Sequence, residues 1–363
     1  MNRAQKNAVR KELLNKIMSP ASDKYLSELE SRYLPRVQAY LSDAVGMQTE
    51  ISPLLRYHMG WTNLKGEAEV GSAGKSLRPI LCLVACEMAG GEWITAIPAA
   101  AALELIHNFS LIHDDIQDGD FTRRSRPTLW SEWGVAKAVN AGNTMRVIAD
   151  KAMLELKQGE GDSGTAINAA LEGTLRCLDM IEGQYMDMSF ESSTRVSVAN
   201  YLDMVSRKTG ALIESAMYIG ALIATGNKQT ASEFGKCGRN LGVAFQIRDD
   251  YLGVWGNPQN TGKPVGSDIK RKKKSLPTVY MFNHASKNDL KWLETAYSQK
   301  DLNESEVRKV LEIMNRLDGA EYVQCQANIQ AEKTKLKIDK LKVSKESKSQ
   351  LSEINEYFVN RKK

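Results

Sequence analysis

The sequence is poor in proline, with nine residues in 363, and it has few stretches in which apolar and polar residues alternate. Proline interrupts helices and alternation marks half-buried strands, so both shortages favour helix over sheet. Hydrophobic residues make up 42% of the chain and charged residues 26%, which is enough apolar material for a large core. We therefore predict an all-α protein.

Cysteine is also scarce: five residues are scattered along the chain, and no two form a Cys-x-x-Cys pair. Such an odd, dispersed set argues against a disulfide framework and against a zinc site. Cys82 and Cys86 lie four positions apart in an apolar stretch, and we expect them to be small buried side chains. The thiols are predicted to be reduced, as in the cytosol.

Other common signals are missing as well. The net charge of +5 is too small to indicate a nucleic-acid or membrane partner by itself. The N-terminal residues lack the apolar segment of a secretory signal, although their basic character leaves an organelle-targeting peptide as a minor alternative. The longest apolar run, residues 211–224, is interrupted by Glu214 and is too short to cross a bilayer. We expect a soluble, cytoplasmic protein without a transmembrane segment.

Helical apolar spacing recurs through most of the chain. A charge-rich N-terminal segment carries one apolar stripe, formed by Leu26, Leu29, Tyr33, Leu34 and Val37. Two apolar helices are predicted between Pro79 and Ile112, with a turn at Gly90-Gly91. Further helices are expected at 165–190, 198–225, 231–254, from 277 and after 320, with a loop at 256–263. The sequence shows no long, low-complexity segment of the kind that links domains. We therefore predict an N-terminal helical extension, residues 1–50, and a single all-α domain, residues 51–363.

Four acids crowd into residues 113–122, which read HDDIQDGDFT and are followed by two arginines. Asp114, Asp115 and Asp118 fall within roughly 100° of one another on a helical wheel. Crowded carboxylates repel one another and are best tolerated with a cation among them. Oxygen-only ligands favour Mg²⁺, which commonly completes its shell with substrate phosphates. The segment therefore predicts a diphosphate site built through magnesium.

A second acid pair, Asp249-Asp250, shares a helical face with Gln246. Two acid-bearing helices that face each other across a bundle can clamp a small group of metal ions. Solvation or capping at a helix end explains either cluster alone but not both together. His107 lies on the helical face of the first acids, two turns before them, and this alignment favours an anion ligand over a histidine satisfied by the core.

Cationic residues accompany both acid clusters. They are Lys75 and Arg78 before a buried helix, Arg123 and Arg124 after the first acids, Lys208 next to Thr209, and Lys263 and Lys273 after the second acids. The run KRKKK at 270–274 is ambiguous, because such a run can be a nuclear signal, a nucleic-acid patch or a solvated face. No aromatic residue interleaves it, which weakens single-strand binding.

In these stretches the chain resembles the trans-isoprenyl diphosphate synthases of the polyprenyl synthetase family. The matching segments are GKSLRP (74–79), ELIHNFSLIHDDIQDGDFTRRSRPT (104–128), EGQYMD (182–187), SRKTGALIE (206–214) and FQIRDDYLGVWGNPQNTGKPVGSDIKRKKKSLP (245–277). They occur in the family's order and at its spacing. The resemblance implies an isoprenoid-synthase-type bundle of about ten core helices around a deep central cavity, and it implies a homodimer.

The resemblance also implies roles for individual residues. Those that would bind Mg²⁺ are Asp114, Asp115, Asp118, Asp249 and Asp250. Those that would contact the allylic diphosphate are Arg123, Lys208 and Lys263, with Lys273 on the metal side of the same group. Those that would hold isopentenyl diphosphate are Lys75, Arg78, His107 and Arg124. Those that would line the reaction centre are Gln184, Asp187, Thr209 and Gln246.

Two positions depart from the family pattern. Ser76 stands where a second cation is frequent, and Gly253 stands where the second motif commonly has its third aspartate. Because Gly253 shares the face of the acid pair, we expect a carboxylate to be missing there. Phe109 and Ser110, just before the first aspartates, would form the floor that stops chain growth and resemble those of short-chain synthases.

The implied reaction is the Mg²⁺-dependent head-to-tail condensation of isopentenyl diphosphate with an allylic diphosphate, and geranylgeranyl diphosphate is the predicted product. A farnesyl or C25 product is an alternative, as is a non-catalytic partner subunit of another prenyl synthase. A terpene cyclase of related fold would not need the isopentenyl diphosphate ligands Lys75, Arg78 and His107. Nucleic-acid binding through the KRKKK run would leave both acid clusters unexplained, so we expect no nucleic-acid partner.

Overall fold

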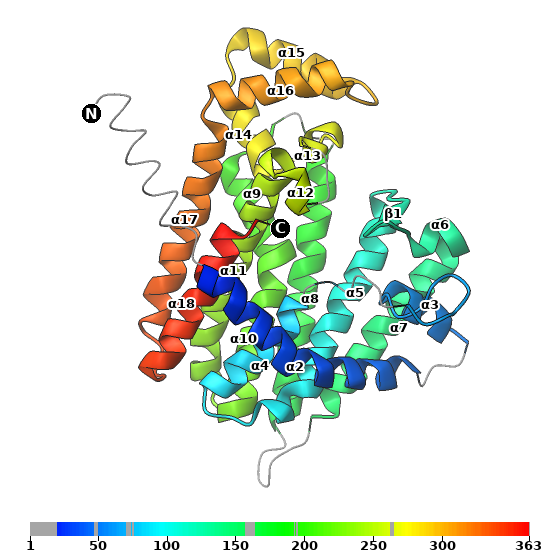
Figure 1. Cartoon of the computed structure of the whole chain (residues 1–363), viewed down its shortest axis with the longest axis vertical. Coiled ribbons are helices and arrows are strands. Elements are labelled where there is room, and N and C mark those ends of the chain that lie inside the picture. The colour runs from blue at the N-terminus through cyan, green and yellow to red at the C-terminus, as the bar shows by residue number, and fades with distance from the viewer. Residues whose placement is uncertain are drawn as a thin grey trace. The chain divides into compact units, whose positions relative to one another are not determined.

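The computed structural model describes residues 20–46, 50–69, 74, 76–156, 164–191, 193, 195–261 and 265–362. Helices form nearly all of this part of the chain (Figure 1). They are α2 (Pro20–Gly46), α3 (Ser52–His58), α4 (Leu77–Met88), α5 (Ile97–Gln117), α6 (Leu129–Trp133), α7 (Val135–Leu154), α8 (Gly164–Glu191), α9 (Val198–Val205), α10 (Ala211–Thr225), α11 (Lys228–Trp255), α12 (Pro258–Thr261), α13 (Ser267–Lys270), α14 (Leu276–His284), α15 (Lys287–Ser298), α16 (Glu304–Arg316), α17 (Gly319–Ile338) and α18 (Lys345–Asn360). The all-α prediction is confirmed.

Within the described ranges, a 3₁₀ turn, a π-helical turn and a two-stranded hairpin interrupt the α-helices. A 3₁₀ turn, Trp93–Ala96, precedes α5, and a π-helical turn, Ser206–Gly210, joins α9 to α10. Strands β1 (Thr122–Arg123) and β2 (Arg126–Pro127) form an antiparallel hairpin directly after the first acids. The loop predicted at 256–263 is partly wrong, because α12 forms one helical turn within it.

The described residues divide into two compact units, which are treated separately below. The first unit contains Glu28–Cys177 and Leu212–Gly235, and the second contains the described parts of Met1–Ser27, Leu178–Ala211 and Lys236–Lys363. The first acid cluster belongs to the first unit and Asp249-Asp250 to the second. Three expectations therefore stay predictions: that the two acid-bearing helices face each other, that a deep central cavity lies between the helices, and that the chain divides at residue 50.

Helix α5 forms the centre of the first unit. It packs against α4 and α7, and its alanine run 99–102 is fully buried. Close packing explains two glycines. A Cβ at Gly142 of α7 would lie 2.4 Å from Nε2 of the His113 side chain, and one at Gly220 of α10 would lie 2.0 Å from the backbone carbonyl oxygen of Cys82. The stretch Trp93–Gln117 is long and apolar enough to span a membrane, but 67% of its most apolar window is buried, as in a core helix.

The predicted N-terminal apolar stripe is buried along α2. Tyr33 is 1% exposed and Val37 fully buried, whereas Leu34 is only half-buried. The Tyr33 ring packs edge-on against Trp93 with 5.1 Å between ring centres, and its hydroxyl donates to Glu87 at 2.5 Å. From Glu28 onward, α2 therefore packs into the first unit through one face.

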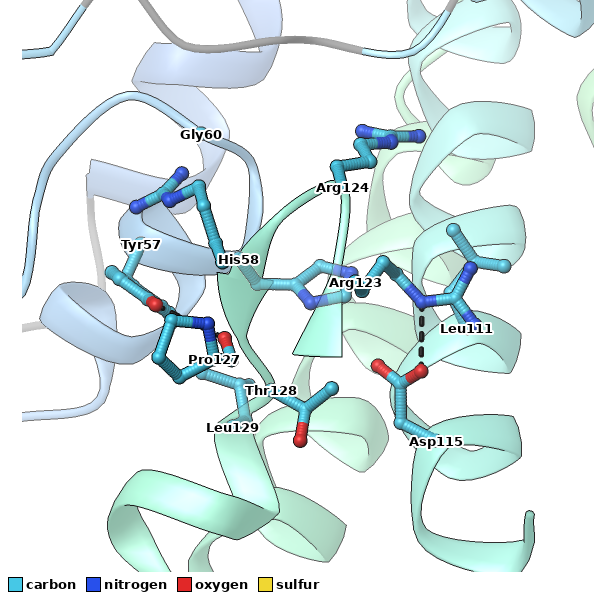
Figure 2. A pocket seen from close by; sticks show the side chains of 11 residues that line it. Tyr57, His58, Gly60, Leu111, Asp115, Arg123, Arg124, Pro127, Thr128 and Leu129 are labelled. Carbon is cyan, nitrogen blue, oxygen red and sulfur yellow. Dashed lines mark hydrogen bonds and ion pairs between the residues drawn. The ribbon is translucent and has the colours of Figure 1, made fainter. Parts of the chain in front are cut away.

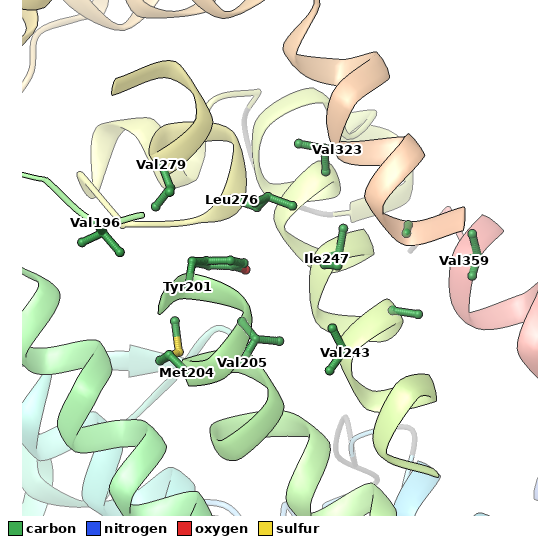
Figure 3. Packing of buried hydrophobic residues seen from close by; sticks show 12 residues of the cluster. Val196, Tyr201, Met204, Val205, Val243, Ile247, Leu276, Val279, Val323 and Val359 are labelled. Carbon is green, nitrogen blue, oxygen red and sulfur yellow. The ribbon is translucent and has the colours of Figure 1, made fainter. Parts of the chain in front are cut away.

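The described residues of the second unit include a buried apolar cluster around α9 and α11. The cluster shown in Figure 3 joins α9, α11, α14, α17 and α18. Its buried members include Tyr201, Val205, Ile247, Leu276 and Val359. Since Tyr201 and Leu276 also contact Asp250, this cluster places the second acid pair.

Candidate active site

The first acid cluster lies at the C-terminal end of α5. The helix ends at Gln117, and the Asp118 amide caps it by donating to the Asp114 carbonyl oxygen at 2.8 Å. The Asp115 carboxylate is 2% exposed and accepts from Arg123 Nε at 2.8 Å. Burial raises the pKa of Asp115 to about 6, although the charge of Arg123 opposes this shift. A buried acid paired with an arginine thus forms one wall of the site.

The β1–β2 hairpin places the arginines that follow the acids. Arg123 pairs with Arg126 across the strands, while Arg124 and Ser125 form the tip with φ of 51° and 62°. Two positive φ values are typical of a two-residue hairpin turn, but they are unfavourable for residues other than glycine. Arg126 holds the hairpin to the preceding segment, because its guanidinium donates to the Thr62 carbonyl oxygen at 2.5 Å and lies 4.2 Å from the centre of the Tyr57 ring.

These elements enclose a pocket between α3, the end of α5 and the hairpin (Figure 2). Its lining residues are Tyr57, His58, Gly60, Leu111, Asp115, Arg123, Arg124, Arg126, Pro127, Thr128 and Leu129. Three guanidinium groups face a single carboxylate in this lining. Such an excess of fixed positive charge with forked donors suits a phosphate-bearing anion.

The predicted isopentenyl diphosphate ligands gather beside this pocket. Loss of water contact lowers the pKa of His107 well below its usual value, and the charges of Arg78 and Arg124 lower it further. The Arg78 pKa falls to about 10 through burial of its guanidinium. The structure thus brings Arg78, His107 and Arg124 together, while Lys75 lies outside the described residues.

Sequence reasoning did not select Glu104, which lies among these cations. It is 5% exposed and accepts from Ser76 Oγ at 3.2 Å, so the departure at Ser76 supplies a hydrogen bond in place of a charge. Burial raises the Glu104 pKa, and the charges of Arg78 and Arg124 oppose this rise. Its place one helical turn before His107 is the signal that would have found it.

The second acid pair lies on α11, where neutral hydrogen-bond donors surround its buried member. Asp250 is 5% exposed and accepts three hydrogen bonds: from the Tyr201 hydroxyl, from the Leu276 amide at 2.8 Å and from Gln246 Nε2 at 3.0 Å. Burial raises the pKa of Asp250 to about 7, although these three hydrogen bonds favour the carboxylate. Gln246 in turn accepts from Thr209 Oγ1 at 3.0 Å. A buried polar chain therefore joins Thr209, Gln246 and Asp250.

Close packing of α8 on the π-helical turn places Lys208. A Cβ at Gly183 would lie 2.3 Å from the Lys208 amide nitrogen, so only glycine permits this approach. Lys208 Nζ binds Asp187 Oδ2 at 2.6 Å, and π-helical turns are frequent at functional sites. Lys208 thus pairs with Asp187 and is adjacent in sequence to Thr209. Gln184, which lies on α8 with Asp187, is 8% exposed.

Asp249 points to a partner that sequence reasoning missed. Its Oδ1 lies 2.8 Å from Arg361 Nη2, and the Arg361 guanidinium lies 4.0 Å from the centre of the Phe245 ring. The Arg361 side chain is 5% exposed and that of Asp249 is 56% exposed. No local pattern announces this pair, because α18 brings Arg361 to α11 from the far end of the chain.

The carboxylate expected to be missing at Gly253 has a replacement. A Cβ at Gly253 would lie 2.1 Å from Asp268 Oδ2, so the Asp268 carboxylate occupies the space of the absent side chain. Position 253 itself carries no carboxylate, and whether Asp268 takes its part in metal binding is not tested by the geometry. Asp268 also adds to the raised pKa of Asp250 through its negative charge.

The remaining predicted residues are placed as follows. Lys273 is exposed, and Lys263 lies outside the described residues. Within the KRKKK run, Lys272 Nζ donates to the Tyr297 carbonyl oxygen at 3.3 Å, and Lys274 Nζ lies 5.2 Å from the centre of the Phe282 ring. These contacts give part of the run a structural role.

The two residues of the predicted chain-length floor are both on α5. Phe109 is 8% exposed, and its ring centre lies 4.9 Å from that of His113. Ser110 Oγ donates to the His107 carbonyl oxygen at 2.7 Å. Phe109 is thus a buried apolar residue five positions before Asp114, and its role in chain length stays a prediction.

The acids suit magnesium by their chemistry. No group of three or more acidic, histidine or cysteine side chains within the described ranges is arranged as a ready metal cage. Mg²⁺ does not need one, because it is usually bound through one or two carboxylates plus water and substrate phosphates. Carboxylate oxygens beside an arginine-lined pocket therefore fit a magnesium ion that binds together with a diphosphate.

Comparison with known proteins agrees with this reading. Residues 62–314 match the family model of the polyprenyl synthetases. A (2E,6E)-farnesyl diphosphate synthase of Mycobacterium bovis is 34% identical over 318 residues, which are 87% of each chain. A geranylgeranyl diphosphate synthase of Mycobacterium tuberculosis is 40% identical over 240 residues, 66% of this chain and 67% of that relative.

A solved structure shares the fold. The crystal structure of a polyprenyl synthetase from Streptomyces coelicolor A3(2) superimposes with a TM-score of 0.86 at 32% identity, over 92% of this chain and 99% of that one. The resemblance that the motifs indicated is confirmed. The chain belongs to the polyprenyl synthetase family and is a prenyltransferase.

Proposed function

We propose that this protein condenses isopentenyl diphosphate with an allylic diphosphate in a Mg²⁺-dependent reaction and releases a short-chain isoprenyl diphosphate, with geranylgeranyl diphosphate as the expected product. The observation that carries the proposal is the pocket lined by Arg123, Arg124 and Arg126 beside the buried Asp115. Its charge suits a diphosphate, and its place next to the first acids suits a metal-bound one. The similar farnesyl and geranylgeranyl diphosphate synthases support a short-chain product.

The acids and arginines would divide the work of binding. Asp114, Asp115 and Asp118, together with Asp249 and Asp250, would hold Mg²⁺, which when bound supplies charge stabilisation to the leaving diphosphate. Arg123 would orient Asp115 and bind the allylic diphosphate. Arg78, His107 and Arg124, with Lys75, would bind isopentenyl diphosphate, and Glu104 would hold two of these cations in place.

The bond changes need no nucleophilic side chain. The allylic carbon–oxygen bond breaks, the double bond of isopentenyl diphosphate attacks the resulting cation, and the departing diphosphate takes the proton that is then lost. Hydroxyl and carbonyl dipoles of Thr209 and Gln246 would stabilise the cation, and Lys208 would bind the leaving diphosphate with Lys263 and Lys273. The side chains around the site must also exclude water, which would quench the cation.

A homodimer is part of the proposal. Helix α8 carries an exposed apolar stripe at one- and two-turn spacing, with Ile167, Leu171, Leu175, Leu178 and Ile181 each between 43% and 62% exposed. A continuous apolar stripe of this kind is typical of an interface. Light scattering of the purified protein is expected to give twice the mass of the 363-residue chain, and a monomer mass would contradict the dimer.

The deciding experiment supplies the purified protein with Mg²⁺, isopentenyl diphosphate and each of the C5, C10 and C15 allylic diphosphates. The product lengths identify activity, starter and chain length together, and Phe109→Ala is expected to lengthen the product by opening the floor. An unchanged product distribution would remove Phe109 from the floor. No product from any starter would support the partner-subunit alternative instead.

A further inference from the structure

The excess positive charge of the chain lies in one short segment. Residues 333–348 contain seven lysines and two acids, a net charge of +5 that equals the net charge of all 363 residues. The lysines are Lys333, Lys335, Lys337, Lys340, Lys342, Lys345 and Lys348. The rest of the chain is therefore balanced between basic and acidic side chains. The segment lies outside every motif quoted above, so the proposed reaction leaves its charge unexplained.

This segment forms the end of α17, the connection to α18 and the first turn of α18 (Figure 1). The two helices pack against each other, and Asn355 Nδ2 of α18 donates to the Ala331 carbonyl oxygen of α17 at 3.0 Å. Thr334 and Ile338 lie on the buried side of α17. The lysines are displayed on the other side, where most of them are exposed.

The lysines are poorly neutralised by the protein itself. Lys348 Nζ donates to the Asp339 carbonyl oxygen at 2.6 Å, and the other six form no ion pair with any residue that the structure describes. Lys333, Lys337 and Lys340 follow one another at spacings of four and three residues, so they are neighbours on the helix and repel one another. A negatively charged surface in contact with this side would relieve the repulsion.

Two exposed aliphatic side chains lie among these charges. Ile329 is 41% exposed and Leu336 is 62% exposed. On a helical wheel, both fall within roughly 100° of Lys333 and Lys337. Glu332 borders this group and is outnumbered by the lysines. Aliphatic tips beside several lysines on one helical face are typical of a helix that lies on an anionic bilayer.

The composition of the segment favours a bilayer over a nucleic acid. Residues 333–348 contain no arginine, whose forked donors match single phosphates, and no aromatic side chain on which bases could stack. Lysines supply a diffuse attraction to many charges at once, which a lipid surface offers. Exposed aliphatic side chains gain from contact with lipid chains and gain nothing from a phosphate backbone.

We propose that a basic strip on α17, formed by Ile329, Lys333, Leu336, Lys337 and Lys340, docks the protein reversibly on an anionic lipid bilayer. The lysines lie at the negatively charged headgroups, and the two aliphatic side chains enter the interface. Each lysine close to such a surface strengthens binding about fivefold. The inference does not rest on the proposed reaction, because neither acid cluster takes part in it.

Sedimentation with lipid vesicles tests the docking on the full chain. Vesicles of phosphatidylcholine alone are compared with vesicles that contain about one third phosphatidylglycerol, at about 0.05 M and about 0.5 M NaCl. The wild type is expected to sediment with the anionic vesicles at low salt, to be released at high salt and to ignore the neutral vesicles. Failure to bind anionic vesicles at low salt would overturn the proposal.

A triple variant locates the contact. Lys333→Gln, Lys337→Gln and Lys340→Gln together are expected to weaken binding to the anionic vesicles about 10²-fold. The matched control removes the same charge from three exposed lysines elsewhere in the second unit, Lys287, Lys291 and Lys300, and should stay within about twofold of the wild type. Thermal unfolding of each variant identifies any loss of fold. Equal weakening by the two triple variants would refute the strip as the docking site.

An aliphatic variant separates a bilayer from another polyanion. Leu336→Ser leaves the charge unchanged and is expected to weaken binding to anionic vesicles about fivefold, while retention on a double-stranded DNA oligonucleotide should not change. Leu336→Ser that binds the vesicles like the wild type, together with tight DNA binding that the lysine triple variant loses, would overturn the proposal in favour of a nucleic-acid partner.

Discussion

The two acid-bearing regions differ in how their carboxylates are paired with arginine. At the end of α5, the buried Asp115 pairs with Arg123 from a hairpin that also lines the pocket. On α11, the buried Asp250 is surrounded by neutral donors, and the exposed Asp249 pairs with Arg361 near the end of the chain. In the first region the arginine lines the pocket that we propose binds substrate. In the second region the arginine is the counter-ion of a carboxylate that we propose binds metal.

Loss of a carboxylate in the first region should have the largest effect. Asp114→Asn is expected to lower kcat by about 10²–10³-fold, because it removes a fixed negative charge proposed to hold the metal at the leaving diphosphate. Asp120→Asn is the matched control, since Asp120 follows the helix and stays outside the proposed ligand set. Steady-state kinetics at saturating Mg²⁺ measure both, and a loss below about tenfold for Asp114→Asn would contradict the proposed metal site.

Removal of the arginine should separate the two regions. Arg123→Ala is expected to lower kcat/KM by tenfold or more, because a substrate contact and the partner of Asp115 are lost together. Arg361→Ala should instead lower the Mg²⁺ concentration for half-maximal activity by up to about fivefold, since an ion pair with one exposed member contributes about 0–1 kcal/mol. A magnesium titration of both variants compares them. Equal loss of activity in the two would show that Arg361 is also a substrate ligand.

The buried acids should make stability depend on pH. The Asp250 pKa of about 7 lies above its ordinary value of 3.8, so the folded protein binds more protons than the unfolded chain between these values. The contribution of Asp250 to the free energy of unfolding of the metal-free protein should therefore be largest near pH 4. It should fall as pH rises to 7, by at most about 1.4 kcal/mol per pH unit.

Urea unfolding in EDTA at several pH values measures this slope. Asp250→Asn should flatten it, and the exposed Glu294→Gln on α15 should leave it unchanged. Asp115, with its pKa raised to about 6, accounts for the slope that remains. An identical slope in wild type and Asp250→Asn would place the titration elsewhere.

The smallest expected effect concerns the hairpin tip. Ser125 has φ of 62°, a conformation that costs residues other than glycine about 1 kcal/mol. Ser125→Gly should therefore raise the free energy of unfolding, measured in urea, by up to about 1 kcal/mol. The gain is reduced by the entropy that glycine adds to the unfolded chain. No comparable gain is expected at Gly253, where a side chain would collide with Asp268. Destabilisation by Ser125→Gly would mean that the serine side chain has a role at the tip.

Local periodicity predicted the helices and the acid clusters well. The stripe on α2 and the helices α8 and α11 follow from spacing that repeats every three to four residues, and the turn between α4 and α5 follows from Gly90-Gly91. The same spacing placed Gln246 on the face of Asp250, where the two side chains bond at 3.0 Å. The hairpin was not predicted, because its four strand residues are too few to show alternation and its tip lacks glycine.

The sequence by itself determined which residue types could hold magnesium and diphosphate, because acids and cations cluster within single helical turns and at helix ends. Only the tertiary structure decided their partners: Arg361 for Asp249, Asp268 for the space at Gly253, and Glu104 for the cations. The physical reason is range. A helix repeats within four residues and is legible in the chain, whereas contacts between helices depend on how distant segments pack, which no local pattern records.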